Sequence, residues 1–347
     1  MLKFLTLAVL TIFFQMSNLF AEDTENSKKV IYIYAGYWGG LFDINNPTAN
    51  RDNCLEPTYQ LREDAAKAGY EVRQTTTLNS LTDFELLIVF DVTSVDQFKE
   101  LAKYPKEKLV LFLWEPPSVL SQNYNPVNHH YFSRVYTWND DIVDNKKYFK
   151  FYYPPLQPMI TESMDFDSKK LCVLISCNKQ SGHPNELYSE RKKLIEFFER
   201  NHSQDFDLYG NAWPSLYTTY KGRVERKVDC LKKYKFACAY ENIKGIPGYV
   251  TEKIFDCFHA GTVPIYLGAS NIEMYIPKKC FVARDDFESD EALYTFLKNM
   301  TKEQHNAYVA NIQKFLQSGR AQLYSKENFI KIMLDLFKFQ TNNEQNK

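Results

Sequence analysis

The sequence predicts an α/β protein with two parallel sheets and a helical C-terminal tail. Three observations support this fold class: short apolar runs alternate with amphipathic stretches, a proline-rich segment divides the alternation into two parts, and only helical patterns follow Ser289. Strands that alternate with helices in this way favour parallel sheets covered by helices on both faces. With 347 residues, the chain has the length of two ordinary domains.

The first alternation runs from Val30 to Trp138. Gly69 ends the helix predicted after Pro57, because glycine is common just past a helix C-terminus. Ser94 and Gln97 form a capping box that starts a second helix. Apolar runs predict strands at 30–35, 85–90, 108–114 and 133–138.

Residues 153–170 hold three prolines and no apolar period, so we expect a linker there. The alternation then restarts, with strands predicted at 171–177, 205–210, 236–240 and 263–267, and helices at 186–201 and 250–260. We therefore expect an N-terminal domain over 28–155, a C-terminal domain over 168–316 and a helical tail over 317–347. Both domains have a Rossmann-like pattern, in which ligands bind beyond the carboxyl ends of the strands.

Composition excludes several classes of protein. Lys and Arg (42) nearly balance Asp and Glu (43), giving a net charge of −1, so no basic surplus favours nucleic-acid binding. The seven cysteines contain no C-x-x-C pair, and no structural metal site is expected. His129 and His130 follow a Pro-containing turn without metal spacing and are expected to be exposed in a loop.

Residues 1–21 have the pattern of a signal peptide or short N-terminal anchor. Lys3 precedes the apolar run 4–14, which is too short to span a bilayer comfortably. An ordinary buried N-terminal helix is the alternative. The pattern predicts export, or membrane association through the N-terminus.

The most informative segment is residues 240–268, YENIKGIPGYVTEKIFDCFHAGTVPIYLG. A predicted strand enters a glycine-containing loop, and a helix begins near Thr251. Lys253 lies in the first turn of that helix, and free backbone N–H groups beside a lysine make a good anion site. The alternative is that Lys253 only pairs with Glu252 or Asp256 at the surface.

YEN followed by GYVTEKIFDCFHAGTVPIYLGA closely resembles the donor-binding motif of family 10 glycosyltransferases, the α-1,3/1,4-fucosyltransferases. The resemblance extends more weakly over about residues 108–285. It implies a GT-B type fold, in which two facing Rossmann-like domains enclose a cleft and the C-terminal one holds GDP-fucose. By this resemblance Lys253 neutralises the pyrophosphate, Glu252 contacts the sugar or the ribose, and Asn242 and Tyr249 also line the GDP-fucose pocket.

A second segment, SCNKQSGHPNELYSERKKLIEFF, resembles the opening of the family's donor domain and places Asn178 and Arg191 at the donor. Arg191 would supply a second cation, since a guanidinium can hold two phosphate oxygens. Taken alone, an arginine in an RKK run on a helix is normally a solvated surface residue.

The third match is LFLWEPPSV, in which Glu115 directly follows a buried strand. Family members carry a similar Glu there, which is the presumed catalytic base. The alternative without a catalytic role is a glutamate that reaches solvent at the end of a strand.

The resemblance implies inverting transfer of L-fucose from GDP-β-L-fucose to a glycan hydroxyl, the 3-OH or 4-OH of GlcNAc or Glc. GDP-fucose and an oligosaccharide or glycoconjugate are the expected partners, and the chemistry needs no metal or other cofactor. Ile243 stands where the family usually has Ser, which keeps another GDP-sugar open as the donor. From another class, the alternative is an exported, non-catalytic two-domain binding protein. The expected location is the Golgi lumen in a eukaryote, or the periplasm or envelope in a bacterium.

Overall fold

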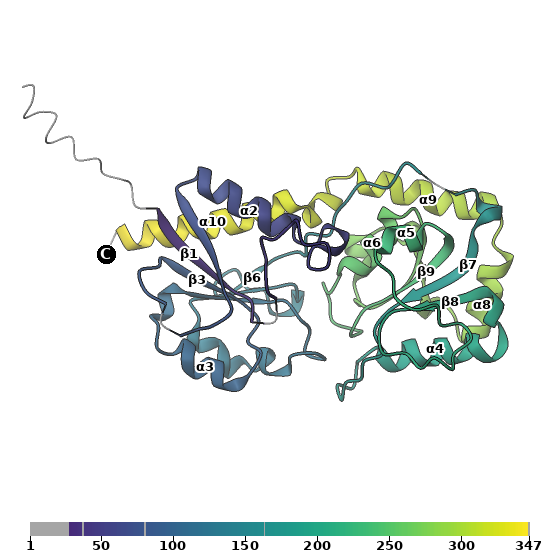
Figure 1. Ribbon diagram of the computed structural model, residues 1–347, viewed down its shortest axis with the longest axis horizontal. Helices are drawn as coiled ribbons and strands as arrows, with labels where there is room; N and C mark the ends of the chain where they lie inside the picture. The colour runs from purple at the N-terminus through teal and green to yellow at the C-terminus, as the bar shows by residue number, and fades with distance from the viewer. Residues whose placement is uncertain (1–27, 37, 80, 163, 346–347) are drawn as a thin grey trace, which may run out of the picture.

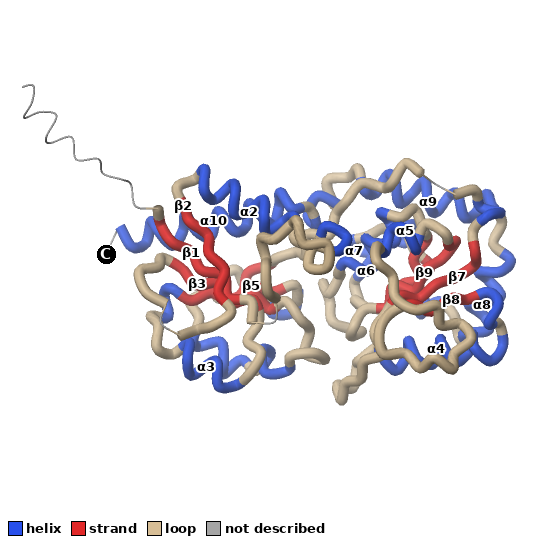
Figure 2. The backbone as a smooth tube through the Cα atoms, viewed as in Figure 1, coloured by secondary structure: helices blue, strands red, loops and turns tan. Residues whose placement is uncertain are grey.

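The computed structural model describes residues 28–36, 38–79, 81–162 and 164–345, and it contains two parallel sheets (Figure 1). The strand order is β2-β1-β3-β4-β5-β6 in the six-stranded sheet and β11-β10-β9-β7-β8 in the five-stranded sheet. Each sheet lies in its own half of an elongated molecule, with helices packed around it (Figure 2). The predicted signal segment 1–21 lies outside the described residues. Among the described helices, none combines the length and hydropathy that a membrane span requires.

The six-stranded sheet forms the N-terminal half, and its centre is the most apolar part. Every residue of β3 and β4 is buried, as the two predicted apolar runs indicate. The bounds of the elements are β1 (Lys29–Tyr34), α2 (Glu56–Lys67), β2 (Tyr70–Thr75), β3 (Leu86–Phe90), α3 (Val95–Leu101), β4 (Leu109–Leu113), β5 (Arg134–Thr137) and β6 (Tyr148–Lys150). The edge strand β2 and the short β6 are additions to the predicted set.

The five-stranded sheet forms the C-terminal half. Its elements are β7 (Lys170–Ile175), α4 (Tyr188–Asn201), β8 (Phe206–Tyr209), α5 (Lys227–Leu231), β9 (Tyr234–Tyr240), α6 (Glu252–His259), β10 (Val263–Leu267), α7 (Ile272–Tyr275), β11 (Val282–Ala283), α8 (Asp290–Asn299) and α9 (Lys302–Leu316). Helix α6 buries Ile254, Phe255, Cys257 and Phe258 against the sheet. The helical spacing of these side chains on one face explains why the helix lies where the motif predicted it.

The last helix, α10 (Lys326–Gln345), returns to the N-terminal half and lies beside α2 (Figure 2). Phe329, Met333 and Phe337 belong to the same apolar cluster as Ile31 and Ile33 of β1. The expected tail is therefore part of the N-terminal core, while the expected domain bounds stay predictions.

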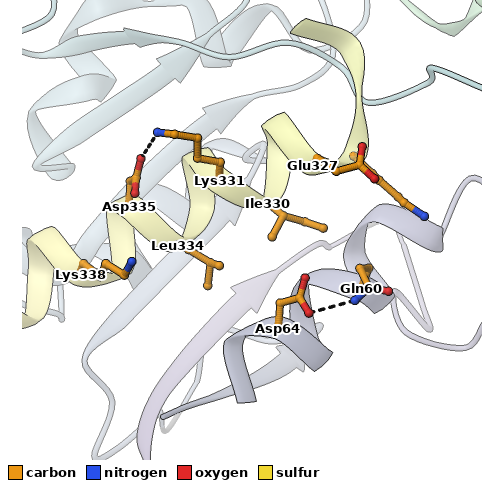
Figure 3. A pocket seen from close by; sticks show the side chains of 9 residues that line it. Gln60, Asp64, Glu327, Ile330, Lys331, Leu334, Asp335 and Lys338 are labelled. Atoms are coloured by element: carbon orange, nitrogen blue, oxygen red, sulfur yellow. Dashed lines mark hydrogen bonds and ion pairs between the residues drawn. The ribbon is translucent and has the colours of Figure 1, made fainter. Parts of the chain in front are cut away.

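A shallow pocket of about 530 Å³ lies between α2 and α10 (Figure 3). Its rim is charged, and two pairs of its residues already bond to each other: Gln60 with Asp64 at 3.0 Å, and Lys331 with Asp335 at 2.6 Å. This pocket lies on the helical face and not at the carboxyl ends of the strands, so the fold gives no reason to assign it to the site predicted from the motifs.

In each sheet the strand order reverses beside the first strand, which opens a crevice at the strands' carboxyl ends. The crevices fall between β1 and β3 in one sheet and between β7 and β9 in the other. Two hydrogen bonds show that these ends meet across the halves. Ser118 Oγ donates to Asn242 O over 3.4 Å, and Ser181 Oγ donates to Ser118 O over 2.7 Å. The structure therefore places one candidate site between the two sheets.

Candidate functional site

Lys253 lies in the first turn of α6, next to the carboxyl end of β9. Its Nζ is 3.2 Å from Glu241 Oε2, 3.3 Å from Glu252 Oε1 and 3.0 Å from Thr251 Oγ1. Burial lowers the pKa of Lys253, but the charges of Glu241 and Glu252 outweigh it and raise the pKa above its usual value. The ammonium is therefore held charged at the start of a helix, where N–H groups also favour an anion.

The surface-only alternative for Lys253 is wrong in two respects. Its side chain is 23% exposed, and one of its partners is the buried Glu241. Asp256, the other partner considered, instead accepts from Lys227 Nζ at 2.6 Å.

Glu241 is a site residue that the sequence analysis missed. Its side chain is 0% exposed, and it accepts the N–H and the hydroxyl of Thr251 at 2.9 and 2.7 Å. A Cβ at Gly268 would lie 2.5 Å from Glu241 Cγ, so the glycine at the end of β10 leaves room for this carboxylate. Burial raises the pKa of Glu241, and the charge of Lys253 opposes that rise. The sequence feature that could have identified Glu241 is its position directly after a predicted strand, in the segment YEN.

Arg191, on α4, is buried with 5% exposure and is not a solvated surface residue. Its Nη2 donates to Tyr240 O and Glu241 O, both at 2.6 Å, and to Asn242 Oδ1 at 3.0 Å. Its Nε is buried and has no hydrogen-bond partner among the described residues. The structure thus brings Arg191, Asn242 and Lys253 together around the end of β9.

Glu115 follows β4 and is held by its backbone. Asp91 is fully buried, with a left-handed φ of 60°, and it accepts the N–H groups of Trp114 and Glu115, each at 2.8 Å. The hydroxyl of Tyr124 donates to Glu115 O at 2.7 Å. The backbone of Glu115 is therefore fixed at the strand end, and the residue is only partly exposed there.

Electrostatics link Glu115 to the opposite sheet. Burial raises the pKa of Glu115, while the charge of Lys253 lowers it and the charge of Glu252 raises it. The hydrogen bond from Ser118 Oγ to Asn242 O also joins the segment that follows Glu115 to the segment that precedes α6. The structure therefore brings the predicted base and the predicted phosphate-binding lysine to the same site.

Glu252 differs from Glu241 in its surroundings. Its side chain is 47% exposed. Burial raises its pKa, but the charges of Lys253 and Lys227 and a backbone N–H lower it to about 2. Glu252 is therefore ionised at any working pH. The backbone N–H of Lys227 donates to Asp52 Oδ1 at 2.7 Å, which ties this edge of the site to the N-terminal half.

Tyr249 and Asn178, which were also predicted to line the donor site, contact other parts of the protein. Tyr249 is 2% exposed, and its ring packs 4.4 Å from the ring of Trp138, in the apolar cluster of the N-terminal half. The side chain of Asn178 donates to Ala212 O at 3.1 Å and fixes the loop after β8. Within the described part of the chain, Asn178 therefore holds a neighbouring loop and makes no hydrogen bond to Arg191 or Lys253.

The arrangement can hold an anion between Lys253, Arg191 and the α6 N-terminus, opposite a carboxylate with a raised pKa. Among the described residues, no group of three or more His, Cys, Asp or Glu side chains has the geometry of a metal site.

Comparison with known proteins shows which family and which fold this chain resembles. Residues 167–318 match the family model described as glycosyltransferase family 10 (fucosyltransferase) C-term. Alpha-(1,3)-fucosyltransferase FucT of Helicobacter pylori is 32% identical over 122 residues, covering 34% of this chain and 25% of its own. The bovine (Bos taurus) 4-galactosyl-N-acetylglucosaminide 3-alpha-L-fucosyltransferase 9 is 29% identical over 218 residues, covering 62% of this chain and 54% of its own. The chain therefore spans between a quarter and about half of the length of these relatives.

Solved structures share the fold. A crystal structure of an alpha1,3-fucosyltransferase aligns with a TM-score of 0.56 at 16% identity, covering 91% of this chain and 92% of its own. Phage T4 BGT with its UDP-glucose substrate aligns with a TM-score of 0.54 at 13% identity, covering 90% of this chain and 99% of its own. The fold is GT-B, as the resemblance implied. Residues 167–318 are therefore similar to the C-terminal part of glycosyltransferase family 10, the fucosyltransferases.

Proposed function

We propose that this protein transfers L-fucose from GDP-β-L-fucose to a hydroxyl of a glycan acceptor, with inversion, to form an α-fucoside. One observation carries the proposal. The segment that follows Glu115 contacts the segment that precedes α6, because Ser118 Oγ donates to Asn242 O at 3.4 Å, and the charge of Lys253 lowers the pKa of Glu115. A transferase of this kind needs a base and a phosphate-binding cation on opposite sides of one cleft.

The donor would bind at the C-terminal sheet. Lys253 and the first-turn N–H groups of α6 would hold the pyrophosphate, and Arg191, whose buried Nε has no partner among the described residues, would supply a second cation. Asn242 and Glu252 would contact the ribose or the sugar. The positive side chains of Lys253 and Arg191 would stabilise the negative charge that develops on GDP as it leaves. The chemistry would then need no metal.

Glu115 would act as the general base. The acceptor O–H gives its proton to the Glu115 carboxylate, the acceptor oxygen bonds to C1 of fucose, and the bond from C1 to the phosphate oxygen breaks. The transition state resembles an oxocarbenium ion, as in glycoside cleavage. A base of this kind typically contributes about 10²–10⁴-fold to the rate. Burial raises the pKa of Glu115, which makes it a stronger base than an exposed glutamate.

The names of the relatives support the 3-OH of a GlcNAc or Glc unit as the acceptor position. We also propose that residues 1–21 direct the protein to a compartment outside the cytosol, or anchor it at a membrane. Ile243 is buried, with 1% exposure, and bridges to Glu186 in an antiparallel pair. Its side chain therefore packs away from solvent, so the absence of the family's serine there does not by itself favour another donor.

The test is an assay of GDP release with purified protein, GDP-fucose and N-acetyllactosamine, with product analysis by NMR. We expect GDP release that depends on the acceptor, and an α-linked fucose in the product. GDP-mannose in place of GDP-fucose is the second arm. Turnover with GDP-mannose alone would show another donor, and donor binding without turnover of either sugar would show a non-catalytic binding protein.

A further inference from the structure

Lys253 is shared by two carboxylates before any ligand arrives. Its Nζ lies 3.2 Å from Glu241 Oε2 and 3.3 Å from Glu252 Oε1. The next cation, Lys227, is held by Asp256 at 2.6 Å. The positive charge of Lys253 is therefore already balanced from within the protein, whereas the guanidinium of Arg191 donates to carbonyl and amide oxygens.

A nucleotide-sugar diphosphate brings two more negative charges to this point. Neither of its phosphates has a proton to gain or lose near neutral pH, because both are diesters. Glu241 is 0% exposed, so water cannot screen it from an anion bound to Lys253. Two anions that share one cation in a desolvated space disfavour the ionised state of the group that can still take a proton.

We propose that Glu241 takes up a proton when the diphosphate of the donor binds at Lys253, so that donor binding is linked to proton uptake. The proton comes from solvent and adds to a carboxylate oxygen of Glu241, and no bond to the donor is made or broken. This inference rests on the proposed function, since it places the donor at this site.

The surroundings select Glu241 over Glu252 as the proton acceptor. Glu252 is 47% exposed, and neighbouring cations lower its pKa to about 2, so it stays ionised. Burial raises the pKa of Glu241. The hydroxyl of Thr251, 2.7 Å from Glu241 Oε2, can donate to the carboxylate or accept from the carboxylic acid. Both protonation states of Glu241 therefore fit the same geometry.

Charged and titratable groups face Glu241 from each neighbouring element. Lys253 of α6 and Arg191 of α4 favour the ionised carboxylate, and Glu252 of α6 disfavours it. Tyr249 from the preceding loop and Tyr266 of β10 are both buried, and burial raises their pKa values so that they stay neutral. A bound diphosphate would offset the effect of the two cations, which leaves burial and Glu252 to favour the acid.

The experiment is calorimetric titration of the protein with GDP-fucose in two buffers of different ionisation enthalpy, at the same pH. The difference in measured heat gives the number of protons exchanged. For the wild type we expect uptake of up to about one proton per donor, and an affinity that falls by up to about tenfold per pH unit as the pH rises. For Glu241→Gln we expect less than about a twofold change in affinity between about pH 6 and pH 8, and tighter binding than the wild type at the higher pH, because a buried negative charge is removed.

Glu252→Gln is the matched control, since it makes the same chemical change in the other carboxylate of Lys253. We expect this variant to keep the proton uptake, whatever its affinity, with the pH dependence displaced to lower pH because the charge of Glu252 no longer raises the pKa of Glu241. Wild-type binding without proton uptake would overturn the inference, and so would a Glu241→Gln variant that keeps the wild-type pH dependence or binds more weakly at every pH. If Glu241→Gln does not fold, the two-buffer titration of the wild type decides alone. Failure of the wild type to bind GDP-fucose at all would instead contradict the proposed function.

Discussion

The charge of Lys253 lowers the pKa of Glu115, although Lys253 follows a strand of one sheet and Glu115 follows a strand of the other. Long-range coupling of this kind is screened within about 8–10 Å in water at physiological salt. The hydrogen bonds of Ser118 with Asn242 and Ser181 join the same strand ends, as expected for the facing sheets of the GT-B fold. The predictions below follow from this relationship and from the packing around it.

Glu115→Gln should lower kcat about 10²–10⁴-fold, because the amide cannot accept the acceptor's proton. GDP-fucose affinity should remain near the wild-type value, since the donor groups lie on the other sheet. The check is steady-state kinetics together with calorimetric binding. Because burial raises the pKa of Glu115, wild-type kcat should fall as the pH drops through that raised pKa. A Glu115→Gln variant with normal turnover would remove Glu115 from the mechanism.

Lys253→Met should weaken GDP-fucose binding and abolish measurable transfer, because it removes the charge at the start of α6 and leaves Glu241 buried without its cation. Lys227→Met is the comparison variant: Lys227 pairs with Asp256 and not with Glu241, so transfer should be reduced less. The check is to measure GDP-fucose affinity and the rate of fucose transfer for both variants. Equal losses in the two variants would mean that Lys253 has no special role.

Gly248→Ala should destabilise the protein and reduce transfer. Gly248 has a φ of 83°, and an added Cβ would lie 2.3 Å from Trp138 O and 2.6 Å from Lys150 Nζ, in the N-terminal half. Gly245→Ala is the control, because its φ is 81° but nothing lies within 4 Å of its added Cβ. Thermal unfolding of both variants separates backbone strain, common to both, from the steric contact between the halves. A Gly248→Ala variant no less stable than Gly245→Ala would contradict the close contact.

Stability should decline in mild acid because His129 is buried in its neutral form. It is 4% exposed and bonded to Tyr148 Oη at 3.0 Å and Asn123 O at 2.6 Å, and burial lowers its pKa. The unfolded chain therefore binds more protons than the folded chain below about pH 6.5. This contribution to stability is complete above that pH and is lost as the pH falls toward the lowered pKa. Urea unfolding against pH, for the wild type and His129→Gln, tests this; the same acid slope in both would contradict it.

The parts of the fold that the sequence predicts best are those with a continuous apolar signal. Strands β3 and β4 are buried along their whole length and were predicted from such runs. Strand β2 was missed because four of its six residues, YEVRQT, are exposed or partly exposed polar side chains at a sheet edge. The return of α10 to the N-terminal half was also missed, since helical periodicity shows which face is apolar but not which surface covers it.

Some residues of the candidate site were also predictable from the sequence, and others were not. The grouping of Glu115 with Lys253 follows from a general rule, that residues after parallel strands gather at one edge. Glu241 was missed because its burial depends on Thr251 and Gly268, which are distant in sequence. The expectation that His129 is exposed was wrong, because its ring nitrogens find partners in Asn123 and Tyr148 that no local pattern reveals.

The central claim is that one site is built from both sheets, and an NMR titration of the Glu115 carboxyl tests it most directly. The carboxyl would be observed in the wild type and in Lys253→Met, with Lys227→Met as the control. Loss of the Lys253 charge should raise the pKa of Glu115, and the control should change it less. An unchanged pKa of Glu115 in Lys253→Met would contradict a shared site.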